Sequence, residues 1–344
     1  MKRTVYLLLL LLSAMLLLLG ACAAAEEPSP ELAEYVEPEP VIVAYNPLTN
    51  VGMDREVQAR LLCVSIDNNP EARMHSGISK ADLLYELPAE GGIPRIVAVF
   101  YSQPADMIGP VRSSRPYIID VARGLDGLFV HCGWSEDARL YLQSGVVDYL
   151  NELTYSDYFW RDSRRDMPHN LYTSTSDIYN YLQSYELRRV QEVRPLVFRE
   201  DGEPLGGVET GTDIYVTYDY ADNYYQYIPE EGLYYRYIDG EPHMDIAYNK
   251  QIAVANIIIQ KVSSTVLDSE GRLHIDMTAG GEAILLSGGQ MLEGSWSRAD
   301  LDSETIFTDS EGNEFALATG LTFIQICDQH VEIDVPLIDG AAAE

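Results

Sequence analysis

The chain has 344 residues, which is long enough for two domains of ordinary size. Its formal net charge is −31, and loss of the two cations Lys2 and Arg3 with a leader peptide would take it from −31 to −33. A surface of this sign argues against nucleic acid as a partner, and against broad electrostatic adhesion to anionic lipids or wall polymers.

Residues 1–21 have the order of a secretory signal: two basic residues, an apolar run from Val5 to Leu19, and small residues before Cys22. The apolar run is shorter than the ~20 residues that a spanning helix needs. The sequence Leu-Gly-Ala-Cys that ends at Cys22 looks like a bacterial lipobox, after which the cysteine receives a diacylglycerol. We therefore expect a lipoprotein signal peptide over residues 1–21, and lipid attachment at Cys22 that anchors the chain to the extracytoplasmic face of the cell membrane. An ordinary signal peptide with an incidental cysteine is the alternative.

Residues 22–40 are rich in Ala, Glu and Pro and show no apolar periodicity. This composition predicts a disordered acidic tether. We expect two folded domains after it, at residues 41–192 and 193–335.

Strand and helix signals alternate in residues 41–192. Apolar runs predict strands at 61–66, 83–87, 93–101 and 128–130, and a Gly-Gly turn makes a hairpin of the second and third. Helices are expected at 116–123, 135–143 and 176–190, with a loop at 155–172. This order predicts an α/β domain, in which ligand sites gather at the carboxyl ends of strands. Five polar residues fall at such positions, namely Asp67, Glu90, Arg112, Arg115 and His131.

From Pro195 onward, short β-rich runs are separated by turn dipeptides such as Asp201-Gly202 and Asp239-Gly240. This half is expected to be a mainly antiparallel β domain. The fold class is therefore an α/β N-terminal domain followed by a mainly antiparallel β C-terminal domain, α+β overall.

The candidate binding site is the start of the helix at Pro116. Ser113 and Ser114 can cap this helix, while Arg112 and Arg115 flank it with planar hydrogen-bonding forks. Because free amides and the helix dipole favour anions there, the stretch predicts a site for phosphate or carboxylate. The loop at 155–172 adds polar residues that suit the same pocket: Arg161, His169 and Asn170.

The arginine content of the first half supports an anion site and also allows a simpler interpretation. From Arg95 to Arg165 the chain has eight arginines and no lysine, which favours fixed anion contacts. The alternative is that these arginines pair with nearby Asp and Glu. Cys63, Cys132 and Cys327 lie in or beside apolar runs and are expected to be free thiols. A Cys63–Cys132 disulfide is the alternative, and the spacing of the cysteines does not support it.

Two classes of function remain open. The chain is either a binding module for an anionic cell-envelope ligand or an envelope protein, or an enzyme, a hydrolase or transferase, acting on a phosphate-bearing wall precursor or glycopolymer. In the enzyme, Glu90 or His131 would act as general base and the arginines would stabilise developing charge. No metal site is predicted, because the histidines never fall at i and i+4 and no paired cysteine motif occurs. No cofactor is expected.

The chain also resembles a known family, the YerB-like bacterial lipoproteins, over nearly all of its length beyond the tether. In the first half the resemblance rests on VSIDNNPEAR from Val64, ADLLYELPAEGGIPR from Ala81, IGPVRSSRPY from Ile108, FVHCGWS from Phe129 and PHNLY from Pro168. In the second half it rests on YYRYIDG, ANIIIQ, LEGSW and FIQI. The resemblance implies a cell-envelope lipoprotein with an α/β domain and a β domain. It implies no reaction and no catalytic residues.

Overall fold

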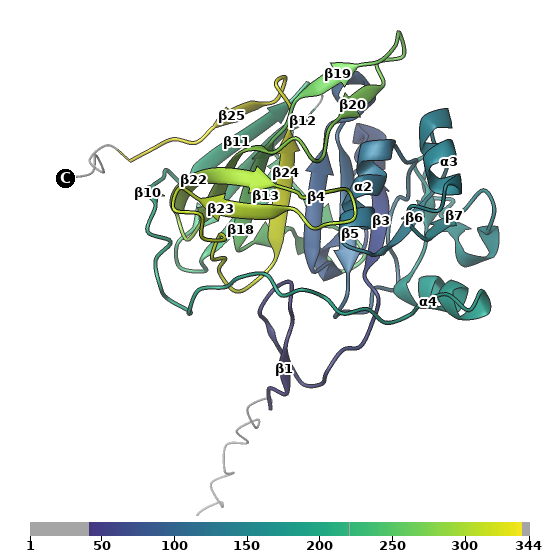
Figure 1. Ribbon diagram of the computed structural model, residues 1–344, viewed down its shortest axis with the longest axis horizontal. Coiled ribbons are helices and arrows are strands. Elements are labelled where there is room, and N and C mark those ends of the chain that lie inside the picture. The colour runs from purple at the N-terminus through teal and green to yellow at the C-terminus, as the bar shows by residue number, and fades with distance from the viewer. Residues whose placement is uncertain (1–40, 220, 339–344) are drawn as a thin grey trace, which may run out of the picture. The chain divides into compact units, whose positions relative to one another are not determined.

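The computed structural model describes residues 41–219 and 221–338 (Figure 1). The expected signal peptide, the tether and Cys22 lie outside these residues. Within the described ranges, no helix is long and apolar enough to cross a membrane.

An 11-stranded sheet runs through both halves of the chain (Figure 1). Along it the strands follow the order β10 (Val208–Glu209), β22 (Gln290–Ser297), β21 (Gly281–Ser287), β18 (Asn256–Lys261), β24 (Thr322–Cys327), β4 (Leu83–Leu87), β5 (Arg95–Phe100), β3 (Leu62–Asp67), β6 (Leu128–His131) and β7 (Tyr149–Asn151), and β23 (Ile306–Asp309) pairs with β22.

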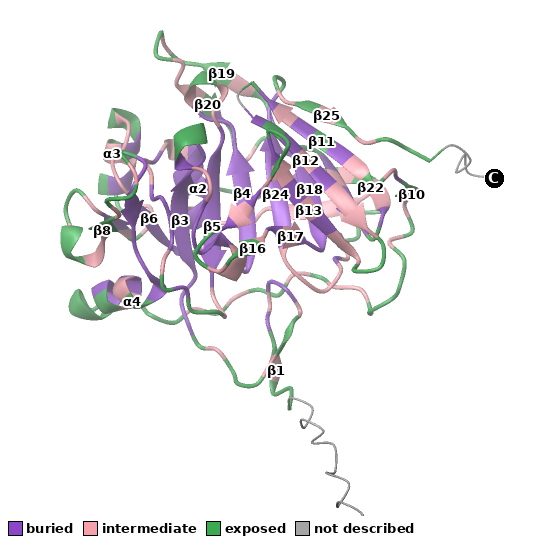
Figure 2. Cartoon of the chain, turned by 180° about the vertical axis from the view of Figure 1, so that it is seen from behind, coloured by how far each residue is buried: buried purple, intermediate pink, exposed green. Residues whose placement is uncertain are grey.

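Strand direction determines which residues share an edge of this sheet. β3, β6 and β7 pair in parallel, as do β4, β24 and β18, and β5 lies antiparallel between β3 and β4. The carboxyl ends of β3, β4, β6 and β7 therefore meet at one edge, together with the start of β5. The central strands β3, β4, β5, β6 and β24 are buried on both faces (Figure 2), as is usual for strands of a mostly parallel sheet covered on two sides.

Three helices cover the first half of the sheet. α2 (Pro116–Gly124) and α3 (Glu136–Gln143) pack on the face that carries Cys63 and Phe129, and α4 (Thr175–Ser184) packs on the face of Leu62 and Val64. Alternate residues of β3 thus enter different cores, since successive side chains of a strand point to opposite faces. Short 3-10 turns complete this half, at η1 (Pro70–Ala72), η2 (Ile78–Lys80), η3 (Glu90–Gly92) and η4 (Ser156–Tyr158).

A six-stranded antiparallel sheet packs against the second half, on the same face as α4. Ile214, Val216 and Tyr225 of this sheet share a core with Ile257 and Phe323 of the large sheet. Its strands are β14 (Glu241–Pro242), β13 (Leu233–Ile238), β12 (Ala221–Ile228), β11 (Asp213–Tyr218) and β25 (Glu332–Asp334), with β17 (Ala253–Val254) on β13.

Four two-stranded ribbons surround these sheets. They are β1 (Ala44–Tyr45) with β2 (Gly52–Met53), β8 (Trp160–Arg161) with β9 (Leu171–Tyr172), β15 (Met244–Asp245) with β16 (Lys250–Gln251), and β19 (Ser264–Val266) with β20 (Leu273–Ile275).

The predicted fold class is confirmed: an α/β half is followed by a mainly antiparallel β half. The helix expected at 176–190 is shorter, because the chain leaves it at Tyr185 and Glu186 adopts a positive φ of 53°. The loop expected at 155–172 contains η4, β8 and β9. The boundary between residues 192 and 193 falls between α4 and β10 and stays a prediction, since β4 and β24 pair across it.

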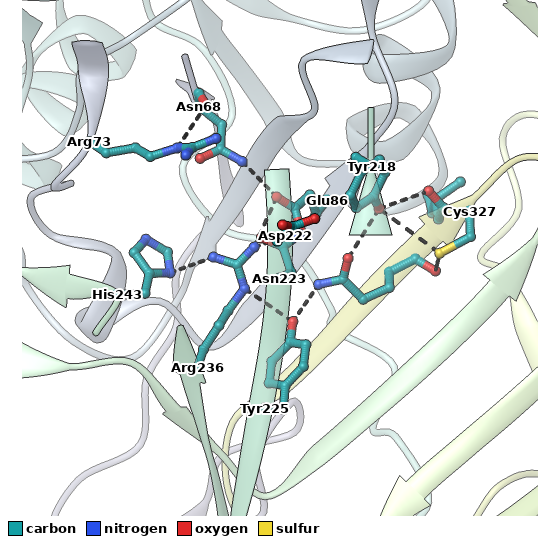
Figure 3. Close-up of polar contacts among 12 residues, drawn as sticks. Asn68, Arg73, Glu86, Tyr218, Asp222, Asn223, Tyr225, Arg236, His243 and Cys327 are labelled. Carbon is teal, nitrogen blue, oxygen red and sulfur yellow. Dashed lines mark hydrogen bonds and ion pairs between the residues drawn. The ribbon is translucent and has the colours of Figure 1, made fainter. Parts of the chain in front are cut away.

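A buried polar network links the two halves behind the sheet edge (Figure 3). Glu86 of β4 and Arg236 of β13 form an ion pair at 2.8 Å with no exposed side-chain surface on either residue. Glu86 also accepts from Asn68 at 2.6 Å and from Asn223 at 3.0 Å. Asn68 directly follows β3, so this network fixes the end of the strand from which the candidate site is built.

Candidate functional site

Asp67, the last residue of β3, is the centre of the site. It is 1% exposed and has three side-chain partners. Its carboxylate lies 3.4 Å from Arg95 Nη1, 3.3 Å from Arg112 Nε and 2.7 Å from His169 Nδ1. These partners come from β5, from the segment before α2 and from the segment before β9, so the site joins parts of the chain that are far apart in sequence.

The charges around Asp67 keep it ionised. Burial alone would raise the pKa of this carboxyl group, but Arg95 and Arg112 lower it, as do hydrogen bonds from His169 and the amide of Asn69, and the net pKa shift is downward. Burial also lowers the pKa of Arg95, and the neighbouring guanidiniums of Arg112 and Arg115 act in the same direction. Buried like charges this close repel one another, which favours an additional negative group.

Arg112 is the more exposed of the two arginines that contact Asp67. Its backbone bridges two strands, since its amide donates to Ser65 O at 2.8 Å and its carbonyl accepts from Cys132 N at 3.0 Å. Its side chain is 30% exposed, against 2% for Asp67. The arginine is therefore held by rigid strands while part of its guanidinium remains open to solvent.

Arg115 has a carboxylate partner of its own. Its Nε forms a short ion pair with Glu90 of η3, and its Nη1 donates to Ser114 O at 2.6 Å. Both side chains are less than one fifth exposed. In this cluster, which we call the arginine cluster, Arg95, Arg112 and Arg115 thus share two carboxylates, Asp67 and Glu90.

A second polar group lies beside the arginine cluster at the ends of β6 and β7. Arg161 donates to Asn170 Oδ1 at 2.9 Å and lies 3.4 Å from Glu152 Oε1. The Cys132 thiol donates to Glu152 Oε2 at 3.2 Å. Burial, followed by Glu152, raises the pKa of this thiol to about 12, while Arg161 and Arg112 oppose the rise. The thiol is therefore protonated at neutral pH.

The structure corrects the expected capping of α2. Arg115 is the N-cap residue, and no side chain caps the helix. The Ser114 hydroxyl donates to Gly133 O at 3.4 Å, and the Ser113 carbonyl accepts from Ser65 at 3.3 Å. The two serines hold the segment against β3 and the turn after β6, because it runs extended between these strands before the helix begins.

The two catalytic candidates lie in different surroundings. His131 is fully buried against the rings of Phe129, Trp134 and Tyr149, and its Nδ1 contacts Gly133 O at 2.8 Å. Burial lowers the pKa of His131 to about 4. A ring enclosed in this way has no route to a substrate proton. The Glu90 carboxylate forms an ion pair with Arg115.

The structure thus brings Arg112, Arg115, Glu90 and His169 to one edge, with Arg161 and Asn170 beside them. The two flanking arginines face different carboxylates, so the pairing alternative weighed from the sequence holds for each of them. Sequence reasoning placed Asp67 at a strand end, among the positions where ligand sites gather, but it gave Arg95 and Glu152 no place in the site. The turn signal Asp-Asn-Asn-Pro directly after an apolar strand was the available clue for Asp67.

The cysteines and the possible metal ligands are the other reactive groups of the described residues. Cys63, Cys132 and Cys327 are free thiols, as expected. Among the described residues, no three His, Cys, Asp or Glu side chains converge as they would around a metal ion.

Comparison with known proteins places the chain in a family. Family models described as the N-terminal and C-terminal domains of a protein of unknown function, DUF3048, match residues 48–188 and 214–324. The chain is 34% identical over 305 residues to "Putative lipoprotein YerB" of Bacillus subtilis (strain 168), which covers 86% of this chain and 87% of that protein. The crystal structure of YerB protein from Bacillus subtilis superposes with a TM-score of 0.77 and 31% identity, over 85% of this chain and 99% of the solved chain. The chain therefore belongs to the DUF3048 family, which includes the putative lipoprotein YerB, and its two halves correspond to the two DUF3048 domains.

Proposed function

We propose that the protein is an extracytoplasmic lipoprotein, anchored through lipidated Cys22, that binds an anionic, phosphate- or carboxylate-bearing ligand of the cell envelope at the arginine cluster. One observation carries the proposal. Three guanidiniums share two carboxylates at this edge, in a chain whose formal net charge is −31. A local positive excess in a strongly acidic protein selects anions at that place and repels them elsewhere.

The exposure of the groups supports ligand access from one side. Asp67 lies behind Arg112, and the ion pair uses the arginine's Nε. Within the described part of the chain, no protein acceptor binds the two terminal nitrogens of Arg112. These nitrogens belong to a planar fork, which is the geometry that binds phosphate or carboxylate oxygens in pairs.

Arg161, which is held by the buried amide of Asn170, extends the proposed site. Arg161 is 36% exposed at its side chain and is 3.4 Å from its carboxylate partner, which is a weak contact. A ligand with two anionic groups, or with one anion and hydroxyl groups, could therefore contact Arg112 and Arg161 together. This arrangement favours a phosphorylated glycopolymer over inorganic phosphate.

The test is binding of a defined probe. We expect inorganic phosphate and glycerol phosphate to shift the side-chain Nε–H signal of Arg112 in ¹⁵N NMR spectra of the protein, with glycerol phosphate bound more tightly. Arg112→Gln should weaken binding at least about tenfold, the effect of losing about 1.4 kcal/mol of charge-assisted hydrogen bonding. Arg139→Gln is the matched control, because Arg139 is an exposed arginine of α3 paired with Glu136. Equal binding by both variants would refute the proposal.

A catalytic role is the second candidate, and the Asp67–His169 pair favours it. The buried carboxylate contacts His169 Nδ1 at 2.7 Å, while Nε2 faces the exposed Glu71 at 3.3 Å. A buried carboxylate that orients an imidazole is the arrangement of a general base, and His169 replaces His131 in this role. This candidate predicts slow release of p-nitrophenol from p-nitrophenyl phosphate. His169→Gln should remove that release while phosphate binding persists, whereas absence of release from the wild-type protein leaves binding as the function.

A further inference from the structure

The hairpin formed by β1 and β2 exposes an unusual amount of apolar surface. Val41, Ile42, Val43, Tyr45 and Val51 are 77%, 53%, 56%, 60% and 47% exposed. These five belong to the 19 large exposed apolar residues of the described chain, and they fall within 11 consecutive positions. A concentration of this kind marks an interaction surface, whereas single exposed apolar residues need no explanation.

The hairpin is held rigidly at its turn and is open at its other end. Leu48 is 2% exposed in a hydrophobic core, and Asn46 donates to the buried Asp82 at 2.6 Å. The carbonyl of Thr49 accepts from Gly320 at 2.7 Å, and Asn50 donates to Thr319 at 3.1 Å. The exposed residues lie beyond this anchored turn (Figure 2). The fold therefore presents the apolar surface in a fixed orientation.

We propose that this apolar hairpin, residues 41–53, lies in the interfacial region of the phospholipid bilayer to which the protein is anchored. The inference goes beyond the anion site and rests on lipid attachment at Cys22. Its occupant is the lipid surface itself, contacted through Val, Ile and Tyr side chains. Aliphatic residues enter the boundary between headgroups and acyl chains, and tyrosine is typical of that depth.

Chain length favours the bilayer as the occupant. Eighteen residues separate Cys22 from Val41, and a segment of that length spans at most about 60 Å when fully extended. The hairpin is the first part of the folded unit after the anchor, so its effective concentration at the membrane exceeds that of any other surface of the protein.

Charge and geometry argue against the other occupants. The chain carries a formal charge of −31, so contact with an anionic membrane must come from apolar side chains and not from general attraction. β1 and β2 have two residues each, which is too short an edge to build a sheet with a second copy. The glycan strands of a cell wall offer no extended apolar surface to match these side chains.

Fluorescence quenching tests the proposal with the full-length lipidated protein in phosphatidylcholine vesicles. Tyr45→Trp places a reporter on the hairpin, and Val43→Trp provides a second one if the first disturbs the fold. Leu267→Trp is the matched control, because Leu267 is 56% exposed and lies just beyond the strand β19. Each is compared with the wild-type protein, whose native tryptophans give the background, in vesicles with and without lipids brominated near the headgroup.

We expect brominated lipid to reduce the fluorescence of the hairpin reporters at least about twofold while the Leu267→Trp reporter changes little. Ile42→Ser and Val51→Ser, added to Tyr45→Trp, should restore most of the signal while the protein still floats with the vesicles. Equal quenching of the hairpin and control reporters overturns the proposal. So does quenching that grows with protein density in vesicles without bromine, which would indicate contact with a second copy. Protein that fails to float overturns it as well, and this failure is separate from loss of phosphate binding.

Discussion

Breaking the buried ion pair between Glu86 and Arg236 should test whether the two halves form one cooperative unit. The perturbation is Arg236→Met, which removes the charge and keeps the length of the side chain. Arg236 contacts Glu86 at 2.8 and 3.0 Å, the Tyr225 hydroxyl at 3.2 Å and His243 Nδ1 at 2.6 Å. All of these groups are buried, so none can turn to water after the substitution.

The size of the expected loss in stability follows from the contacts that Glu86 keeps after the substitution. Glu86 would keep its bonds from Asn68 and Asn223 but lose the cation that pairs with it among the described residues, in a place where its side chain has no exposed surface. Removing one partner of such a pair costs about 3–5 kcal/mol, because an uncompensated charge stays buried. Arg188→Met is the control, since Arg188 and Asp126 form an exposed pair, and pairs of this kind contribute about 0–1 kcal/mol.

Urea unfolding of the detergent-solubilised protein measures both variants. We expect one transition for the wild-type chain, with the same midpoint for Trp134 in the first half and Trp296 in the second. Arg236→Met should lower the free energy of unfolding by about 4 kcal/mol, and Glu86→Gln combined with it should cost less than the two single changes together. A loss no greater than that of Arg188→Met would show that the network does not join the halves, and the reasoning would be refuted.

Three further predictions concern single positions. Burial lowers the pKa of His131 to about 4, so the unfolded chain binds a proton below pH 6.5 that the folded chain does not. Stability should therefore fall as the pH drops from about 6.5 toward 4, and His131→Asn should reduce this loss by up to about 3 kcal/mol in urea titrations at each pH; a slope unchanged in the variant contradicts this. Burial and Glu152 raise the pKa of the Cys132 thiol to about 12. The thiol should therefore react with iodoacetamide at pH 8 on the order of 1000-fold more slowly in the folded than in the unfolded chain, as measured by mass spectrometry. Comparable rates would refute the raised pKa. Gly92→Ala should destabilise the protein more than Gly91→Ala by about 1–3 kcal/mol in thermal unfolding. Both glycines have a positive φ, but a Cβ added at Gly92 would clash with Asp219 Cβ, whereas one added at Gly91 would meet no other group. Equal losses in the two variants would contradict this close approach.

Local patterns predicted most of the first half. The strand at 83–87 and the helix from Pro116 were correct within one residue, since each combines an apolar run with a clear start or stop signal. Ser135 caps α3 as expected, with its hydroxyl accepting from Ala138 N. The helix from residue 176 was too long, because Tyr185 and Leu187 continue its apolar period while the backbone reverses at Glu186.

Local patterns could not predict that one sheet continues through both halves of the chain. β24 contacts β4 across more than 230 residues of sequence, and nothing in either apolar run specifies its partner. Both strands are buried on both faces, so neither shows the alternation that identifies a solvent-facing strand. The boundary expected at 192–193 rests on a composition change near Pro195 and stays a prediction, because the sheet passes through both halves.

The site shows the same limit at the level of single residues. Arg112 and Arg115 were found because they are adjacent to a helix start, which is a local signal. Asp67 and His169 are 102 residues apart, and only the fold shows that the aspartate lies between the histidine and two arginines. This changes the chemistry that was inferred from sequence. An open pair of arginines would bind any anion, whereas arginines already paired with Asp67 and Glu90 are fixed in orientation and have less charge to offer a ligand. The proposed site should therefore be more selective in geometry and weaker in net charge than the sequence alone suggested, which is why its decisive experiment compares ligands of different shape at Arg112.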